Sequence, residues 1–350
     1  MKAEIISRYA AFWAHSKVDR AVLHLSVHDG AAYAPPKDED EHWTCLDYRI
    51  GEAEHSLRHT QYFAEGYAGT WLNLGPGTLA AMMGADYHFT PNTVWFGEKP
   101  LITDWAYAKN LRLQAGGMTA IVDRLTQGYC DFGKGKMLIG ITDLGGTLDV
   151  LASFRGTQDL LMDLYDYPEA VLDAIDRIDD VWEEAFTQSH RVLARHNHNG
   201  AMSAWIPIYC EKRWFPLQCD FSAMISPEQF ERFVMPSLVR GANFLDHSIY
   251  HLDGRGELPH LDQLLSISRL DGIQWVPGDG APGHESDCWF PYYERIQAAG
   301  KNLVLTGVSS AENCIKLLKN LKHDGLFINA ELASAEEAEA VIAAAEKYAR

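Results

Sequence analysis

Eight short apolar runs, separated by longer amphipathic segments, constrain the fold of this chain more than any other feature of its sequence. The runs are too short for core helices and are rich in branched residues, so we interpret them as buried parallel strands. They occupy residues 21–27, 70–74, 137–142, 201–206, 248–252, 272–276, 302–307 and 325–329.

The segments between these runs have the periodicity of helices. Pro168 stands at a favourable first position of the longest one. Strands that alternate with helices predict a single (β/α)8 barrel, a TIM barrel of eight parallel strands, over residues 1–350, with a helical extension at residues 1–20. The alternative is a doubly wound open sheet. No GxGxxG follows the first run, which weighs against a dinucleotide-binding version of that fold.

The net charge and composition of the chain exclude some classes of binding partner. The 350 residues carry a formal net charge of -18, so we expect no nucleic-acid and no anionic-membrane partner, because both need clustered Lys and Arg. The six cysteines are scattered without a CxxC pair and are interpreted as free thiols. The N-terminus lacks the features of a signal peptide, and no apolar run approaches the ~18 residues of a membrane span. We therefore expect a cytoplasmic protein.

In a barrel of this type, catalytic and binding residues lie at the carboxyl ends of the strands and in the loops that follow them. This rule selects three candidate catalytic residues and five candidate substrate-binding residues. The catalytic candidates are Asp143, Tyr209 and Asp220, and the binding candidates are Trp71, Asn73, Trp205, Ser222 and Trp275.

The segment His251-Leu252-Asp253 is the most suggestive of these strand ends. Residues i and i+2 of a strand point to the same face, so His251 and Asp253 would project together at the barrel mouth as two potential metal ligands. The alternative is a hydrogen-bonded pair that closes a turn before Gly254.

The other candidates also have structural alternatives. Asp143 and Asp220 could bind substrate or act as bases, or they could simply cap helices, and the same ambiguity extends to Ser222. The tryptophans Trp71, Trp205 and Trp275 could line a pocket or pack in the core.

Three segments resemble the uroporphyrinogen decarboxylase-like superfamily. These are residues 143–176, residues 221–238 (FSAMISPEQFERFVMPSL) and residues 250–256 (YHLDGRG), the last being similar to a fifth-strand His-x-Cys-Gly or His-x-Asp-Gly motif. The superfamily contains porphyrin decarboxylases and cobamide-dependent methyltransferases. The arginine-rich N-terminal signature of the decarboxylases is missing, and Gly75 stands where they carry an aspartate. The chain therefore resembles the methyltransferase branch more closely.

This resemblance implies a metal site. The methyltransferases bind zinc through a His, a Cys two residues later and a further Cys after the last strand. Here His251 matches, Asp253 replaces the first Cys, and Glu331 occupies the position of the second. A His/Asp/Glu set is harder than His/Cys/Cys, so it suits zinc or another metal that polarises an oxygen or amine. The implied substrate is a methoxy or methylamine compound or a folate-type acceptor.

The resemblance leads us to expect a metal-dependent methyltransferase that moves a methyl group between a small molecule and a corrinoid protein. Asp143, Asn73 and Tyr209 would orient the substrate. No Asp-x-His-x-x-Gly motif is present, so the cobamide would arrive on a partner protein. The alternatives are a metal-assisted decarboxylase or lyase of a small acid, and a binding protein without catalysis. Whether the chain forms a homodimer stays open.

Overall fold

The computed structural model describes residues 3–197 and 200–349, which form a mixed α/β fold. The strands of the larger sheet are β1 (Val22–His28), β2 (Thr60–Ala64), β9 (Trp214–Gln218), β10 (His247–Asp253), β11 (Gly272–Val276), β12 (Asn302–Leu305) and β13 (Leu326–Leu332). Those of a second sheet are β3 (Gly69–Trp71), β6 (Leu138–Ile141), β7 (Ala201–Ser203) and β8 (Ile206–Cys210). A separate hairpin pairs β4 (Tyr87–Phe89) with β5 (Val94–Phe96).

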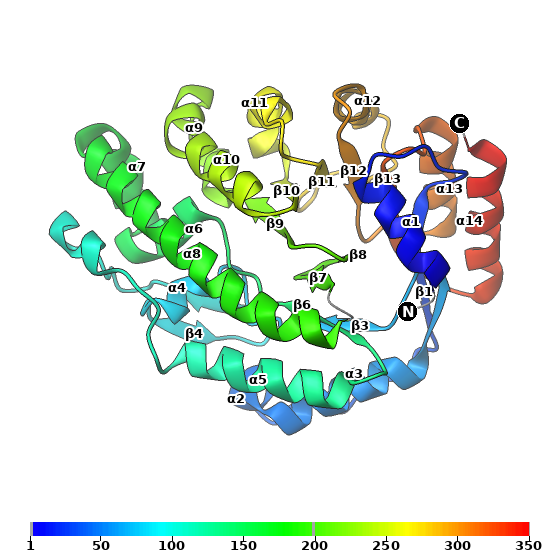
Figure 1. Ribbon diagram of the computed structural model, residues 1–350, viewed down its shortest axis with the longest axis horizontal. Coiled ribbons are helices and arrows are strands. Elements are labelled where there is room, and N and C mark those ends of the chain that lie inside the picture. Colours follow the sequence, from blue (N-terminus) through cyan, green and yellow to red (C-terminus); the bar gives the residue numbers. More distant parts are fainter. Residues whose placement is uncertain (1–2, 198–199, 350) are drawn as a thin grey trace.

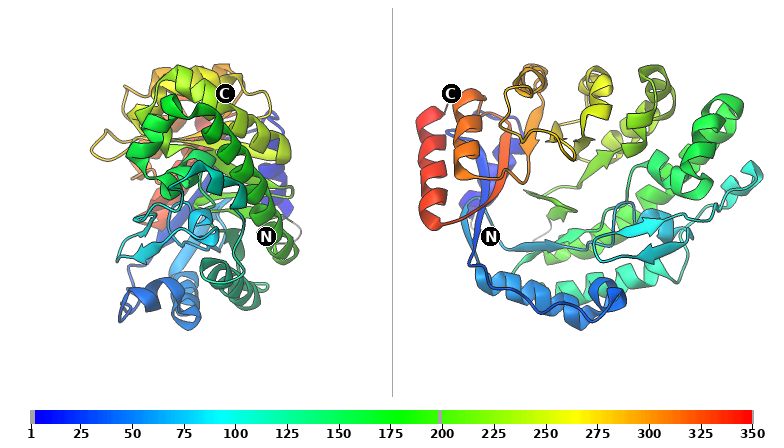
Figure 2. Two further views of the ribbon diagram at one scale, coloured as in Figure 1. Left: turned by 90° about the vertical axis from the view of Figure 1, so that its left-hand side faces the viewer. Right: turned by 180° about the vertical axis from the view of Figure 1, so that it is seen from behind.

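The larger sheet has seven strands in the order β2-β1-β13-β12-β11-β10-β9, all parallel except β2 (Figure 1). The second sheet has the order β3-β6-β7-β8, in which β8 alone is antiparallel. In Figures 1 and 2 the sheets line the inside of an arch, and most helices lie on its outer side. This is the layering that buried parallel strands require.

The helices connect these strands and cover them. They are α1 (Ala3–Trp13), α2 (Glu39–Thr44), α3 (Leu46–His59), α4 (Leu79–Met82), α5 (Met118–Gly133), α6 (Thr147–Arg155), α7 (Thr157–Asp166), α8 (Pro168–His196), α9 (Pro227–Phe233), α10 (Met235–Phe244), α11 (Leu261–Ser266), α12 (Phe290–Ala298), α13 (Ala311–Asn320) and α14 (Ala335–Tyr348). Three 3-10 helices are η1 (Trp105–Asn110), η2 (Asp220–Met224) and η3 (Arg255–His260). Among the described helices, none combines the length and apolarity needed to cross a bilayer.

Seven of the eight apolar runs form strands close to their predicted positions. The run 201–206 does not form one strand, because the chain reverses at Ala204, whose φ is +44°, and β7 and β8 form a hairpin. The strand that pairs with β10 is instead β9, which the sequence analysis missed. Pro216 interrupts the apolar run of β9, and proline is tolerated there because β9 is the edge strand of its sheet.

The predicted barrel is shown only in part. Around the arch, the parallel strands follow one another in chain order as they would in a barrel. Within the described residues, however, no backbone ladder joins β9 to β7 or β3 to β1, so the hydrogen-bonded ring is not closed. The hairpin at β8 interrupts one junction and the antiparallel strand β2 borders the other.

The helix α1 confirms the predicted N-terminal helix over residues 3–13, whereas residues 14–20 are not helical. It closes the amino-terminal ends of the strands. Its buried aromatic residues Tyr9, Phe12 and Trp13 pack with apolar side chains from β1, β10, β12 and β13. Asn302, the first residue of β12, donates to the Phe12 carbonyl, and the Trp13 ring stacks on His247, the first residue of β10. The carboxyl-terminal ends are therefore the open side of the sheet.

A buried ion pair fastens the start of β1 to the chain after β2. The Arg20 guanidinium donates to both carboxylate oxygens of Glu65 at 2.8 Å, and the backbone N–H of Leu23 donates to the same carboxylate at 3.0 Å. Arg8 of α1 lies 3.0 Å from it, and the Tyr9 hydroxyl donates to the Glu65 carbonyl. One acidic side chain thus holds the N-terminal helix, the first strand and the loop before β3.

We expect Glu65→Ala to lower the free energy of unfolding by about 3–5 kcal/mol, because it leaves the Arg20 charge buried without its partner. Glu54→Ala is the control, since Glu54 forms an exposed pair with Arg58 that contributes no more than about 0.5 kcal/mol. Urea unfolding followed by circular dichroism measures both. Equal losses in the two variants would contradict the role given to Glu65.

Candidate active site

A cleft opens at the carboxyl-terminal ends of the parallel strands. Its volume is about 440 Å³, which is in the range of small-molecule sites. The ends of β3, β6, β9 and β10 and the β7–β8 turn form much of its wall, with α2 and the β4–β5 turn. The lining residues are Trp43, Trp71, Asn73, Gly75, Pro76, Asn92, Thr93, Asp143, Trp205, Gln218, Asp220, His251 and Asp253.

Three neighbouring parallel strands place polar side chains in one row beneath this cleft. Gln218 of β9 is the register partner of His251 in β10, and His251 is the register partner of Gln274 in β11. Because side chains alternate along a strand, Asp253 projects to the same face as His251, two residues nearer the mouth. Asp220 follows Gln218 by the same spacing, at the start of η2.

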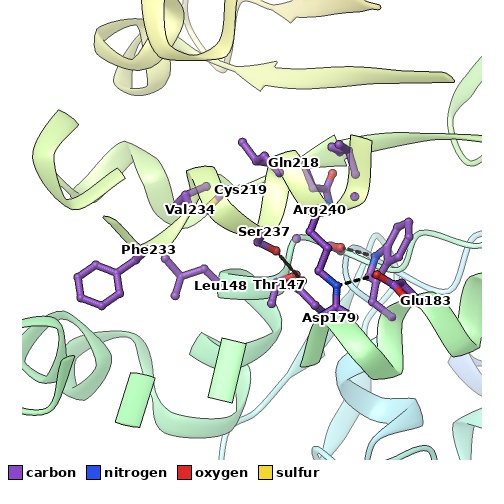
Figure 3. A pocket seen from close by; sticks show the side chains of 16 residues that line it. Thr147, Leu148, Asp179, Glu183, Gln218, Cys219, Phe233, Val234, Ser237 and Arg240 are labelled. Atoms are coloured by element: carbon purple, nitrogen blue, oxygen red, sulfur yellow. Dashed lines mark hydrogen bonds and ion pairs between the residues drawn. The ribbon is translucent and has the colours of Figure 1, made fainter. Parts of the chain in front are cut away.

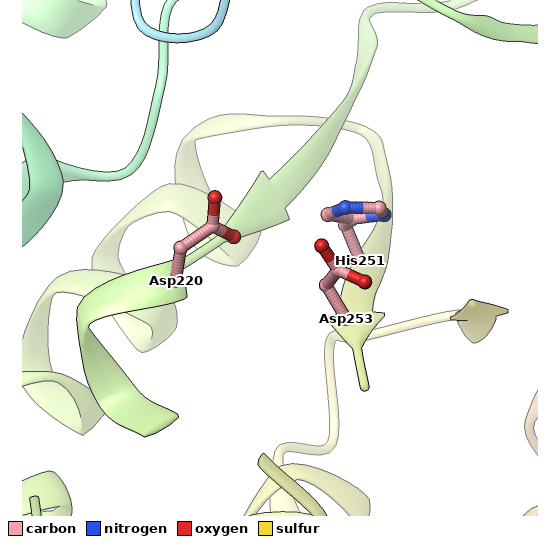
Figure 4. A group of neighbouring side chains, drawn as sticks. All are labelled: Asp220, His251 and Asp253. Carbon is pink, nitrogen blue, oxygen red and sulfur yellow. The ribbon is translucent and has the colours of Figure 1, made fainter. Parts of the chain in front are cut away.

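Asp220, His251 and Asp253 converge at the mouth (Figure 4). One ligand atom of each lies within 4.8 Å of the others, and they are the one such group with metal-ligand chemistry among residues 3–197 and 200–349. The structure thus brings His251 and Asp253 together, as the strand periodicity predicts. Desolvation raises the pKa of Asp220; the charge of Asp253 acts in the same direction, whereas His251 opposes it.

The side chain of Gln274 fixes which nitrogen of His251 carries the proton. The indole N–H of Trp205 can only donate, so the atom that it meets at 3.0 Å is Oε1 of Gln274, while Nε2 donates to Thr306 Oγ1 at 2.7 Å. His251 Nδ1 lies 2.8 Å from the same Oε1 and must therefore be the protonated nitrogen. Neutral His251 keeps its lone pair on Nε2, where it can bind a metal or accept a proton.

Asp143 is a buried acid at the base of the cleft, with 4% of its surface exposed. Its Oδ1 accepts from the Gly145 N–H at 2.7 Å and from Gln218 Nε2 at 3.2 Å. It holds the Gly145 turn and leaves α6 without a side-chain cap, so the helix-capping interpretation does not apply. Desolvation raises the pKa of Asp143 to about 7, so the carboxyl group can accept or donate a proton near neutral pH.

Asp149 of α6 is a site residue that the sequence analysis missed. Its carboxylate accepts from the backbone N–H groups of Asp220 and Phe221, at 3.1 and 2.7 Å, and so positions the start of η2. Desolvation, with the nearby charge of Asp220, raises the pKa of Asp149 to about 8. In the sequence Asp149 looks like an ordinary acid in the first turn of a helix, and only the fold reveals its contact with Asp220.

Tryptophan rings form the apolar wall of the cleft. Trp71 and Trp205 meet edge to face, with ring centroids 6.3 Å apart and an angle of 67° between their planes. Trp205 also packs edge to face on His251 at 5.0 Å. Asn73 lies beside this wall and accepts the Gly75 N–H through its side chain. Trp43 of α2, which was not predicted, lines the same cleft.

Tyr209 does not reach the cleft. Because β8 runs antiparallel to β7, it carries Tyr209 back toward the amino-terminal ends of the strands. There the ring lines a cavity of about 200 Å³ beneath α1, with Tyr9 and Trp13 among its neighbours. Burial raises the pKa of Tyr209 to about 12. The candidate catalytic role of Tyr209 therefore finds no support in its position.

Ser222, Trp275 and Glu331 also lie outside the cleft lining. Ser222 is fully buried and its carbonyl faces His260 Nε2, while Trp275 packs on Trp289 in the core. Glu331 is on β13, separated from His251 by β11 and β12. Asp220, predicted as catalytic, lies beside His251 and Asp253, where Glu331 was expected.

A much smaller pocket, of about 30 Å³, lies behind β9 (Figure 3). Thr147 and Ser237 both donate to Asp179 at 2.5 Å, and Arg240 pairs with Glu183 at 2.7 Å. Desolvation raises the pKa of Asp179 to about 6. The polar side chains around this pocket satisfy one another, and their contacts join α8 to α6 and α10.

Asp143→Asn should stabilise the protein at alkaline pH. The pKa of Asp143 is higher in the folded state than in the unfolded chain, so its ionisation increasingly disfavours folding between pH 4 and 7. The gain of the variant over the wild type should be about 2–3 kcal/mol larger at pH 8 than at pH 5. Urea unfolding at the two pH values measures it, and a pH-independent difference would contradict the raised pKa.

Comparisons with known proteins bear on the fold. No protein-family model and no curated protein matches the sequence. A solved methyltransferase from Methanosarcina mazei is similar in structure, with a TM-score of 0.61 and 13% sequence identity, and the match covers 98% of each chain. At this identity the similarity establishes a common fold and transfers no residue role.

Proposed function

We propose that this protein is a metal-dependent methyltransferase that moves a methyl group between a small molecule and a corrinoid held by a separate partner protein. The observation that carries the proposal is the group formed by Asp220, His251 and Asp253 at the open ends of the strands. The structural similarity to a methyltransferase and the sequence resemblance to the cobamide-dependent branch of the uroporphyrinogen decarboxylase-like superfamily support the same reaction class.

The donor set fits a divalent metal such as zinc. Two carboxylates and an imidazole converge, and Gln274 leaves the His251 Nε2 lone pair unprotonated. Gln274 is the kind of second partner that orients metal-binding histidines in general. Asp220, His251 and Asp253 would hold the ion, which as a Lewis acid would polarise a substrate oxygen or nitrogen.

The other residues of the cleft would bind and orient the substrate. Trp71 and Trp205 offer apolar surface beside the donor group, and Asn73 adds a polar contact. Asp143, with a pKa of about 7, would accept or donate a proton at its carboxyl group. None of the described residues that line the cleft is Lys or Arg, which disfavours the alternative of a decarboxylase or lyase for a small acid.

Metal affinity tests the ligand group. We expect purified wild type to bind one equivalent of zinc, by elemental analysis and by competition with a chromophoric chelator. His251→Ala, Asp253→Ala and Asp220→Ala should abolish this binding. Gln274→Leu should weaken it by about 10- to 100-fold through the loss of the His251 partner.

Glu331→Ala is the matched control, because it removes a carboxylate near the carboxyl-terminal end of β13 that is not in the group. It should bind zinc as the wild type does. Loss of zinc in Glu331→Ala but not in Asp220→Ala would show that the ligands are His251, Asp253 and Glu331 instead. A wild type that stays metal-free after reloading would contradict the metal site altogether.

Methyl transfer is tested with free cob(I)alamin as a stand-in for the partner-bound corrinoid. The zinc-loaded protein should convert it to methylcobalamin, seen by absorbance, with a methoxy or methylamine donor. His251→Ala should reduce the rate by at least about 100-fold, since it removes a side chain that would hold the polarising ion. Failure with every donor, both with cob(I)alamin and with corrinoid proteins, would overturn the proposed function and favour a binding protein.

A further inference from the structure

The charge of the cleft indicates the charge of its ligand. Asp143, Asp220 and Asp253 line it, and no described lining residue is Lys or Arg. An adjoining groove of about 390 Å³ shares Asp220 and adds Asp149, again without a basic residue. An anionic ligand would enter this region without a positive partner, whereas a cation would meet carboxylates on several sides.

Trp71 and Trp205 indicate which kind of cation the cleft would bind. Trp71 and Trp205 are partly exposed, and their planes form a corner with an angle of 67°. In water, a cation that carries methyl groups loses less hydration on an indole face than one that carries N–H donors, and aromatic sites commonly bind quaternary ammonium groups. The cation–π contacts found in the described part of the chain involve other rings, such as Trp105 and Trp289, so neither ring of this corner is covered by an internal cation.

The cleft would still favour a cationic ligand with a metal bound to Asp220, His251 and Asp253. The charges of Asp220 and Asp253 would balance a divalent ion, whereas Asp143 does not belong to that group. Asp143 lines the same cleft as the tryptophan corner and is held by Gly145 and Gln218. The cleft thus has an aromatic wall and one further carboxylate for the substrate itself.

We propose that the cleft binds a methylated ammonium compound, with its N-methyl groups against Trp71 and Trp205 and its positive charge facing Asp143. The assignment of a transferred group rests on the proposed function. In that reaction the carbon–nitrogen bond of one N-methyl group breaks, and its electron pair stays on nitrogen. The new bond to carbon uses the electron pair of the cobalt(I) corrinoid, and the product is a neutral amine. No proton has to move when the nitrogen is quaternary, and since such a nitrogen has no lone pair, the metal ion would polarise an oxygen of the substrate, such as a hydroxyl, and not the nitrogen.

Choline and 3,3-dimethyl-1-butanol form a matched pair of probes, since the second has a quaternary carbon in place of the charged nitrogen. Calorimetric titration of the metal-free and the zinc-loaded protein should show choline binding at least about tenfold more tightly than the neutral isostere. Equal affinity for the two probes, or no binding of choline at millimolar concentration, would overturn the inference.

Substitutions test whether choline binds at Trp71 and Asp143. Trp71→Leu and Asp143→Asn should each weaken choline binding by about tenfold or more, while Trp71→Phe should retain most of it. Glu331→Ala should leave it unchanged. Near-ultraviolet circular dichroism checks that each variant keeps the native packing. Weakening in Glu331→Ala equal to that in Asp143→Asn would mean that choline responds only to the overall charge, and would also overturn the inference.

The outcomes separate this inference from the proposed function. Transfer from a neutral methoxy donor to cob(I)alamin, without choline binding, would leave the methyltransferase proposal intact and overturn the ammonium ligand. Choline binding that needs Trp71 and Asp143, without methyl transfer from any donor, would support the ligand class and overturn the methyltransferase.

Discussion

The register of three parallel strands is the constraint on which the candidate site depends. Backbone ladders place Gln218, His251 and Gln274 side by side, and the next outward-pointing positions follow two residues later. The two amides of this row have different tasks. Gln218 holds Asp143 across the cleft, whereas Gln274 orients His251. A shift of one strand by a single residue would turn its polar side chains away from the cleft and break both contacts.

The parts of the site that depend on local period could be predicted from the sequence. The run before His251 and Asp253 identified a buried strand, and alternation then placed both side chains on one face. The parts that depend on tertiary arrangement could not. Asp220, and not Glu331, lies beside His251 and Asp253 because β9 is adjacent to β10 and β13 is not. Tyr209 is displaced because one residue with positive φ, Ala204, reverses the chain.

Several acidic side chains in this part of the molecule are buried, which lowers the stability of the folded state. Burial raises the pKa of Asp149 to about 8, and that of Glu257, in η3, to about 9, so these carboxyl groups are hard to ionise in the folded state. The Tyr250 hydroxyl donates to Glu257 at 3.0 Å, which is a partial compensation. Such clusters are typical of sites where function, and not folding, selects the residue. The buried Glu65 carboxylate differs, since Arg20 neutralises it with two hydrogen bonds.

The contacts of α1 also have a consequence for the order in which the chain folds. During synthesis α1 is made well before segments that it contacts, because Trp13 donates to the Tyr209 carbonyl, and the Phe12 carbonyl accepts from Asn302, 290 residues later. The aromatic side chains of Tyr9, Phe12 and Trp13 therefore cannot be fully buried until most of the chain has been translated. Closure of the amino-terminal ends by α1 can therefore be completed only after β12 has been made, so its contacts are among the most non-local in the fold.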